Sequence, residues 1–323
     1  MKTHVFHYRS LLKEELQTVQ ALMLETLHVF PQDVAEVLSF IISNGGKRLR
    51  PAMVLLSATL HGADIQKAVP VAAAVELLHT ATLVHDDLID NALIRRGAQT
   101  LNARWTPATT VLAGDVAFAW AAKFATQGEN IRLMRRFSET LATICQGELN
   151  QMFKGRGNIP TEIDYYERIF AKTASLFALT TEVGAILANA SGEVVHQAWR
   201  FGKLLGEAFQ IVDDILDFTS DEATLGKPIA SDLRQGLITL PVLYYCKAHP
   251  DDDCLQVILE RRADDAAIHA IVNDLLRSDA ADQAMAQADA RIVDALAILA
   301  KYPDTPHRGA MEEIARFAIQ RCY

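Results

Sequence analysis

Turn-forming and aromatic residues are scarce in this chain of 323 residues, which has 10 prolines, 16 glycines and only 7% aromatic residues. This scarcity argues against an all-β fold, because such folds need many turns that contain Gly or Pro. The four cysteines, Cys145, Cys246, Cys254 and Cys322, form no CxxC pair. They indicate buried or incidental thiols in a reducing compartment rather than a disulfide framework or a zinc site.

An excess of positive charge is also missing, since the formal net charge is -9. A protein that binds the nucleic-acid backbone needs a basic surface, so we expect no nucleic-acid partner. The N-terminal residues lack the apolar core of a signal peptide, and no apolar run reaches 18 residues without a charged or polar interruption. We expect a cytoplasmic protein without a membrane anchor.

Helical spacing of apolar residues is what the sequence has in abundance, with Leu and Ala dominating. The long central segments are apolar nearly all round, which is typical of inner helices covered by outer ones. We predict an all-α fold, a single domain over 1–323 formed by one large helical bundle with a central apolar cavity. Residues 221–236 are the longest irregular stretch and a candidate mobile flap. The predicted helices are 8–29, 33–43, 51–62, 65–93, 107–127, 130–153, 161–190, 192–221 and 235–247, followed by shorter ones.

Two acidic clusters share one spacing: "DDLID" runs from Asp86 to Asp90, and "DDILD" runs from Asp213 to Asp217. The first and fifth residues of each lie on one helical face. Apolar residues precede both clusters, so mutual repulsion and desolvation would raise the carboxyl pKa values unless a cation compensates. Mg²⁺ binds hard oxygen ligands and often shares carboxylates with substrate phosphates. A single cluster is most often a solvated helix face, but two such clusters in a bundle favour a magnesium site.

Basic residues near these clusters predict binding of phosphate groups, because Arg grips phosphate oxygens in pairs and Lys acts as a point charge. His79 lies two helical turns before Asp86 and is expected to point toward the same cavity. We interpret Arg48 as facing solvent. No Walker loop, Rossmann fingerprint, GxSxG or HExxH is present. The candidate residues for phosphate are Lys47, Arg50, Arg95, Arg96, Lys172, Thr173 and Lys227.

Several motifs in a fixed order make the chain resemble the trans-isoprenyl diphosphate synthases, or polyprenyl synthetases, over nearly its whole length. They include "GGKRLRP", "ELLHTATLVHDDLIDNALIRRG", "KTASLF", "GEAFQIVDDILDF" and "GKPIASDLRQGLITLPVLYY". The chain looks most like the long-chain heptaprenyl and octaprenyl members. The resemblance implies the isoprenoid synthase bundle, usually as a homodimer, and Mg²⁺-dependent condensation of isopentenyl diphosphate with an allylic diphosphate, farnesyl or geranylgeranyl diphosphate.

The resemblance also implies a role for each matching residue. Metal ions and cationic side chains would stabilise charge on the departing pyrophosphate, and the double bond of isopentenyl diphosphate would attack the allylic cation. The implied Mg²⁺ ligands are Asp86, Asp90 and Asp213, with Asp217 as a further candidate. The implied isopentenyl diphosphate site is Lys47, Arg50, His79 and Arg96. The implied allylic diphosphate site is Arg95, Lys172, Thr173, Gln210 and Lys227. The catalytic candidates are Asp86, Asp90, Asp213, Lys172 and Lys227.

Two positions depart from the family pattern. Leu237 stands where a basic or polar residue is common, and Ala230 stands where glycine is frequent. Neither belongs to the acidic clusters, so we expect activity to persist, with affinity for the allylic diphosphate as the property most affected.

Product length is expected to depend on Ala81 and Thr82, which stand five and four residues before Asp86. Short-chain members tend to have aromatic residues there, and side chains at a pocket's floor limit its depth, so small ones predict a product of about C30–C45. Such products form quinone side chains and imply transient membrane association for release. Leu78 and Phe137 are candidates for a deeper floor, although Phe137 is equally well interpreted as an ordinary core residue. Two alternatives remain: a geranylgeranyl diphosphate synthase, or a helical partner subunit of a heteromeric synthase that is inactive alone.

Overall fold

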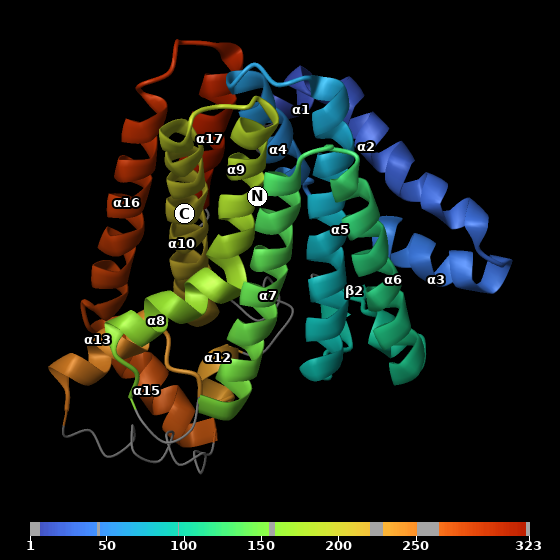
Figure 1. Cartoon of the computed structure of the whole chain (residues 1–323). Coiled ribbons are helices and arrows are strands. Elements are labelled where there is room, and N and C mark those ends of the chain that lie inside the picture. Colours follow the sequence, from blue (N-terminus) through green and yellow to red (C-terminus); the bar gives the residue numbers. More distant parts are fainter. Residues whose placement is uncertain are drawn as a thin grey trace. The chain divides into compact units, whose positions relative to one another are not determined.

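The computed structural model describes the chain in six stretches. Nearly all of this part is helical (Figure 1), and within it the only strands are β1 (Ile94–Arg95) and β2 (Ala98–Gln99), which pair antiparallel. The prediction of an all-α fold is confirmed. The described residues are 7–43, 46–95, 97–154, 159–219, 229–250 and 265–320.

The chain divides into two compact units that exchange segments along the sequence. Unit 1 consists of Met1–Leu141, Leu176–Gly202 and Ile298–Ile314. Unit 2 consists of Ala142–Ser175, Lys203–Ala297 and Ala315–Tyr323. The single domain over 1–323 and its central apolar cavity stay predictions.

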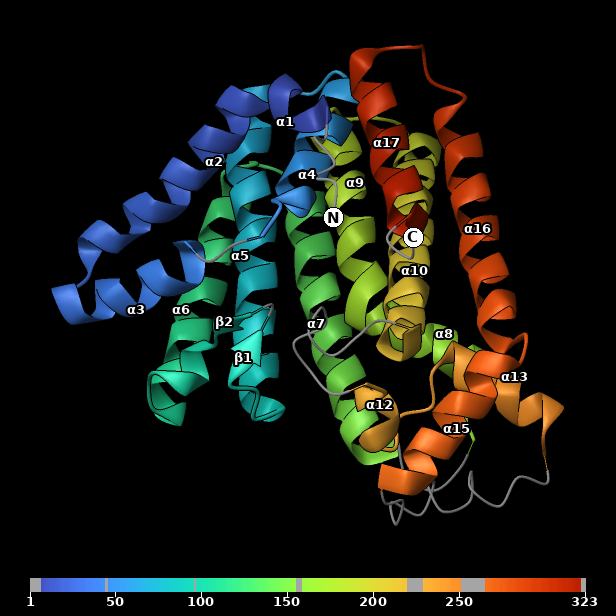
Figure 2. The same cartoon turned by 180° about the vertical axis from the view of Figure 1, so that it is seen from behind.

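Unit 1 is organised around α5 (Ile65–Ile89), whose residues from Ala68 to Leu78 are all buried. A helix that is apolar on every side is stable only inside a core, which explains this burial. The Asp64 side chain caps its start by accepting from the backbone N–H of Gln66 at 2.9 Å. Helix α6 runs beside α5 in both views (Figure 1; Figure 2). The helices wholly in unit 1 are α1 (His7–Leu11), α2 (Lys13–Glu25), α3 (Gln32–Ser43), α4 (Leu49–Leu60), α5 and α6 (Pro107–Thr126).

The helices that lie wholly in unit 2 have between 4 and 13 residues. Helix α8 begins with a capping box, in which the Thr161 side chain and the Asp164 carboxylate satisfy each other's backbone N–H groups. Five residues, Phe170–Ala174, then form a π-helical turn before α9. The helices wholly in unit 2 are α8 (Glu162–Ile169), α12 (Ser231–Arg234), α13 (Leu240–Ala248) and α15 (Asp265–Arg277). Those with residues in both units are α7 (Ile131–Lys154), α9 (Ser175–Leu187), α10 (Gly192–Thr219), α16 (Ala280–Leu299) and α17 (Pro306–Gln320).

Four predicted helix boundaries were wrong. The helix expected over 8–29 is interrupted at Leu12 and ends in a 3₁₀ turn, Thr26–Val29. The helix expected over 65–93 ends at Ile89, where the chain turns into the β1–β2 hairpin. The stretch 161–190 is divided by the π-helical turn, and the helix expected over 235–247 begins only at Leu240. Apolar periodicity therefore predicted where helices occur but not where they break.

Two helical stretches, Ile65–Ile89 and Glu162–Leu187, are long and apolar enough to cross a membrane. In their most apolar windows, however, 72% and 83% of the residues are buried inside the protein. That degree of burial is typical of core helices in a globular fold.

Candidate active site

The first acidic cluster ends α5. The backbone N–H of Asp90 donates to the carbonyl of Asp86 at 2.8 Å, so the last turn is still helical and both side chains share one face. Asp86 is half-buried and Asp90 is exposed. Both carboxylates are therefore placed to receive a cation from solvent.

Asp87 has a different role, which the sequence analysis did not identify. It is buried and accepts a hydrogen bond from Arg95 Nε at 2.6 Å. Burial raises the pKa of Asp87, and the Arg95 guanidinium partly offsets that rise. Arg95, which the resemblance assigns to the allylic diphosphate, is thus held against the first cluster. Arg96 lies outside the described residues.

Three residues predicted to bind isopentenyl diphosphate lie in unit 1. Arg50 Nη1 lies 2.9 Å from His79 Nε2. Because a guanidinium only donates, Nε2 accepts and Nδ1 carries the proton in this arrangement. The Arg50 guanidinium also lies 4.7 Å from the centroid of the Phe177 ring. The Tyr8 hydroxyl donates to the backbone carbonyl of Lys47 at 2.9 Å, which fixes the loop and leaves the Lys47 side chain exposed.

The interpretation of Arg48 as facing solvent was wrong. Arg48 donates to the Glu76 carboxylate, the Gln20 side chain and the Ile42 carbonyl. Its side chain is only 17% exposed. The local sequence could not show this, because two of the three partners lie 28 residues away.

The second acidic cluster lies in unit 2, on α10. Asp213 is half-buried, whereas Asp214 is buried and accepts from the Tyr165 hydroxyl at 2.7 Å and from Gln210 Nε2 at 2.8 Å. Burial, with a contribution from Asp232, raises the pKa of Asp214 to about 7. Among the described residues, both hydrogen bonds to this carboxylate come from neutral groups, in contrast to the Asp87–Arg95 ion pair, and the charge of Arg168 lowers the pKa of Asp214 only in part.

Asp217, predicted as a further metal ligand, is 2% exposed and supports α12. Its carboxylate accepts from the Ser231 hydroxyl and from the backbone N–H of Asp232, both at 3.1 Å. Its backbone carbonyl accepts from the N–H of Ala230 at 2.8 Å. Ala230 adopts a left-handed backbone with φ of 56°, which explains why glycine is frequent at this position of the family.

Lys172 and Thr173 both lie in the π-helical turn. Such turns are rare and often occur at functional sites, since they change the direction of the side chains they carry. The Thr173 hydroxyl donates to Gln210 Oε1 at 2.6 Å, which links it through Gln210 to Asp214. Lys172 Nζ lies 3.4 Å from Glu148 on α7. The structure thus links Thr173 and Gln210 to the second cluster, whereas the Lys172 side chain pairs with Glu148. Lys227 lies outside the described residues.

The carboxylates fit a hard divalent cation by their chemistry. Among the described residues, no group of three His, Cys, Asp or Glu side chains is arranged to hold a metal by itself. Mg²⁺ does not require such a group, because it keeps water ligands and uses one or two carboxylates together with substrate phosphates. The Asp86–Asp90 pair meets that requirement.

The residues predicted to limit product length are placed in unit 1. Ala81 and Leu78 have no exposed surface, and Phe137 is 4% exposed. Thr82 is half-buried, and its hydroxyl donates to the backbone carbonyl of His79 at 2.8 Å. Of the two positions closest to Asp86, Thr82 therefore keeps accessible surface and Ala81 does not. Their role as a floor stays a prediction.

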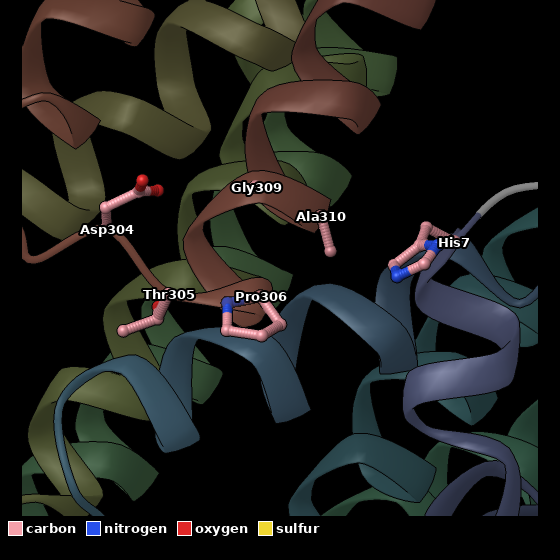
Figure 3. A pocket seen from close by; sticks show the side chains of 6 residues that line it. All are labelled: His7, Asp304, Thr305, Pro306, Gly309 and Ala310. Carbon is pink, nitrogen blue, oxygen red and sulfur yellow. The ribbon is translucent and has the colours of Figure 1, made fainter.

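Two cavities are lined by none of the residues predicted to bind Mg²⁺ or diphosphate. One of about 420 Å³ lies at the start of α17, with His7 facing Pro306 and Ala310 (Figure 3). None of its lining residues belongs to the predicted site. The other, of about 410 Å³, lies in unit 2 between α7, α8 and residues 236–238. Leu237 lines it beside Arg168 and Gln146, so the departure at this position places an apolar side chain in a cavity lined by both polar and apolar residues.

Known proteins are similar to this chain over most of its length. Residues 31–275 match the polyprenyl synthetase family model. Component 2 of heptaprenyl diphosphate synthase from Geobacillus stearothermophilus is 36% identical over 97% of this chain and 98% of its own length. Geranylgeranyl diphosphate synthase from Methanosarcina mazei is 33% identical over 91% of each chain. The crystal structure of a polyprenyl synthase from Caulobacter crescentus CB15, complexed with calcium and isoprenyl diphosphate, has a TM-score of 0.91 and 32% identity and covers 98% of each chain.

The chain therefore belongs to the polyprenyl synthetase family. Its fold is that of the isoprenyl diphosphate synthases, and its activity is that of a trans-prenyltransferase. The resemblance drawn from the ordered motifs is confirmed.

Proposed function

We propose that this chain condenses isopentenyl diphosphate with farnesyl or geranylgeranyl diphosphate in the presence of Mg²⁺, and that it makes an all-trans product of about C30–C45. The observation that carries the product length is the pair of small side chains before Asp86: Ala81 is buried, and Thr82 keeps accessible surface. No aromatic side chain occupies either position to shorten the product.

The chain's own residues are proposed to act in two groups. In unit 1, Asp86 and Asp90 would hold Mg²⁺, while Lys47, Arg50 and His79 would hold isopentenyl diphosphate. In unit 2, Asp213 would hold Mg²⁺, while Lys172, Thr173 and Gln210 would hold the allylic diphosphate. When bound, Mg²⁺ would neutralise charge on the departing pyrophosphate. Apolar side chains around the substrate would exclude water from the allylic cation.

Product chromatography tests the proposed length. The purified chain is incubated with Mg²⁺, labelled isopentenyl diphosphate and farnesyl diphosphate, and we expect a long-chain product. Thr82→Phe is expected to shorten the product, because a phenyl ring there would fill the accessible space. Ala290→Phe on the exposed face of α16 is the matched control and should leave the length unchanged. A geranylgeranyl product from the unmodified chain would support the shorter-chain alternative.

The same assay addresses the partner. We propose a cytoplasmic homodimer that is active alone, with transient membrane association for product release. The relative from Geobacillus stearothermophilus is named as one component of its synthase, which keeps the heteromeric alternative relevant. Turnover by the purified chain, with light scattering to give its mass, would support the homodimer. A folded but inactive chain would support the need for a second subunit.

A further inference from the structure

Arg48 connects three helices to the loop that carries Lys47. Its Nη1 donates to Glu76 on α5 at 2.7 Å, and its Nη2 donates at 2.6 Å to Gln20 on α2 and to the Ile42 carbonyl on α3. All these residues lie in unit 1. The side chains of Arg48 and Glu76 are 17% and 6% exposed. The pair is therefore shielded from water, and its geometry is held more firmly than that of a surface ion pair.

The backbone at Arg48 supports the same conclusion. Its φ is 53°, a left-handed conformation that costs roughly 1–2 kcal/mol for a residue with a side chain. Helix α4 begins at the next residue, Leu49, and carries Arg50 in its first turn. A strained residue of this kind persists only where its surroundings fix it, and here the surroundings are the three hydrogen bonds of its guanidinium.

Glu76 and His79 lie three residues apart on α5, so they occupy neighbouring positions on one side of that helix. Arg48 binds Glu76 and Arg50 binds His79, so the loop and the first turn of α4 are each joined to α5. The Arg48–Glu76 contact includes no residue proposed to bind substrate, although Arg48 is next to Lys47 in the chain. The Arg50–His79 contact is made by two residues that are proposed to bind substrate.

We propose that Arg48 and Glu76 form a positioning pair, which sets the distance between His79 and the segment that carries Lys47 and Arg50, and thereby the affinity for isopentenyl diphosphate. This inference rests on the proposed assignment of Lys47, Arg50 and His79 to that substrate. Neither member of the pair is a catalytic residue, and both act through the residues they place.

Replacing both charges separates positioning from stability. A buried ion pair replaced on both sides by apolar residues is often neutral for stability, whereas removal of one partner leaves an unpaired buried charge. The test therefore compares Arg48→Met, Glu76→Met and the double variant. The matched control is the double variant Arg136→Met with Glu182→Met, because that pair is also part-buried in unit 1, with Nε and Oε2 2.9 Å apart.

Titration calorimetry with isopentenyl diphosphate alone, and separately with farnesyl diphosphate, gives the readout. The double variant is expected to melt near the unmodified protein, yet to bind isopentenyl diphosphate at least about tenfold more weakly, because two of the proposed binding groups would be misplaced. Its affinity for farnesyl diphosphate should change by less than about twofold, as should both affinities of the control, because neither pair contacts a residue proposed to bind that substrate and the control contacts none proposed for isopentenyl diphosphate. Arg48→Lys should fall between, since an ammonium keeps the charge but not the fork of donors.

Three results would overturn the inference. The double variant could bind isopentenyl diphosphate normally, which would make the pair purely structural. Both affinities could fall together, which would indicate a general distortion. The unmodified chain could bind no isopentenyl diphosphate. Because the readout is binding, a wrong product length or a need for a second subunit would contradict the proposed function without changing this result.

Discussion

The two acidic clusters share one spacing, but the buried second aspartate of each cluster has a different kind of hydrogen-bond donor. In unit 1, the buried carboxylate of the first cluster pairs with a cation, Asp87 with Arg95 at 2.6 Å. In unit 2, neutral donors hold Asp214, through the hydroxyl of Tyr165 and the amide of Gln210. The pKa of both carboxyls is raised by burial, and that of Asp214 reaches about 7. An adjacent guanidinium therefore offsets desolvation in one cluster, while in the other the carboxyl partly keeps its proton.

Two further segments, one in each unit, show the same contrast. Each contains a residue with a side chain in the left-handed conformation, Arg48 in unit 1 and Ala230 in unit 2. Arg48 has three side-chain hydrogen bonds that offset its strain. The methyl group of Ala230 can form none, and the hydrogen bonds of this residue are made by its backbone, whose N–H donates to the Asp217 carbonyl. A cluster supported by ion pairs and one supported by neutral donors should respond differently to substitution.

The largest effects on activity are expected from replacing the first aspartate of each cluster. Asp86→Asn and Asp213→Asn should each lower kcat/KM by at least about 100-fold, because metal stabilisation of the leaving group contributes several kcal/mol. Steady-state kinetics with varied Mg²⁺ measures this, and the Mg²⁺ concentration for half-maximal rate should rise in both. Asp289→Asn, on the exposed face of α16, is the control. If only one variant lost activity, the two clusters would not be equivalent in function.

Much of this comparison could be predicted from the sequence, and the limits are physical. Periodicity gave α7 and α10 nearly to their ends, because long apolar stripes determine helices. The repeated spacing of aspartates also identified both clusters. The sequence pattern did not reveal the buried roles of Asp87 and Asp214. The second residue of each cluster is turned about a quarter of the way round the helix from the first, so it faces a different side. The partners that decide those roles, such as Tyr165, lie far away in sequence.

A second comparison concerns the partners of the two buried carboxylates. Tyr165→Phe should destabilise the protein by about 1–3 kcal/mol, because it removes a hydrogen bond from a carboxylate that water cannot reach. Arg95→Gln should cost less than about 1 kcal/mol, because that side chain is 36% exposed and water can replace it. Urea unfolding of both variants measures the difference. Equal losses would show that the first cluster depends on its ion pair as much as the second depends on its hydroxyl.

Two glycines lie in close contact with residues near the predicted binding groups, one glycine in each unit, so the same Gly→Ala change can be compared in both units. A Cβ added at Gly147 would lie 2.5 Å from Cβ of Ala171, and one added at Gly114 would lie 2.2 Å from Nε2 of His85. Ala171 cannot move without the backbone of the π-helical turn, whereas the His85 ring can rotate away. Gly147→Ala should therefore cost about 1–3 kcal/mol. It should also raise KM for farnesyl diphosphate through Lys172.

Gly114→Ala is the milder partner of this pair. It should cost less stability and leave that KM unchanged, since its contact is with the residue before Asp86. Thermal unfolding and separate KM values for the two substrates measure both outcomes. An unchanged KM for farnesyl diphosphate in Gly147→Ala would argue against a role of the π-helical turn in placing Lys172.

The smallest effect is a gain in stability, and it tests the contrast between the two left-handed residues. Ala230→Gly should stabilise the protein by about 1 kcal/mol, because glycine adopts φ of 56° without the steric cost of a Cβ. Arg48→Gly removes the same cost at φ of 53° but leaves Glu76 buried without its cation, so it should destabilise by about 1–3 kcal/mol. Urea unfolding gives both signs. Stabilisation by both substitutions would mean that the hydrogen bonds of Arg48 contribute less than its backbone strain, and the contrast between the two loops would then disappear.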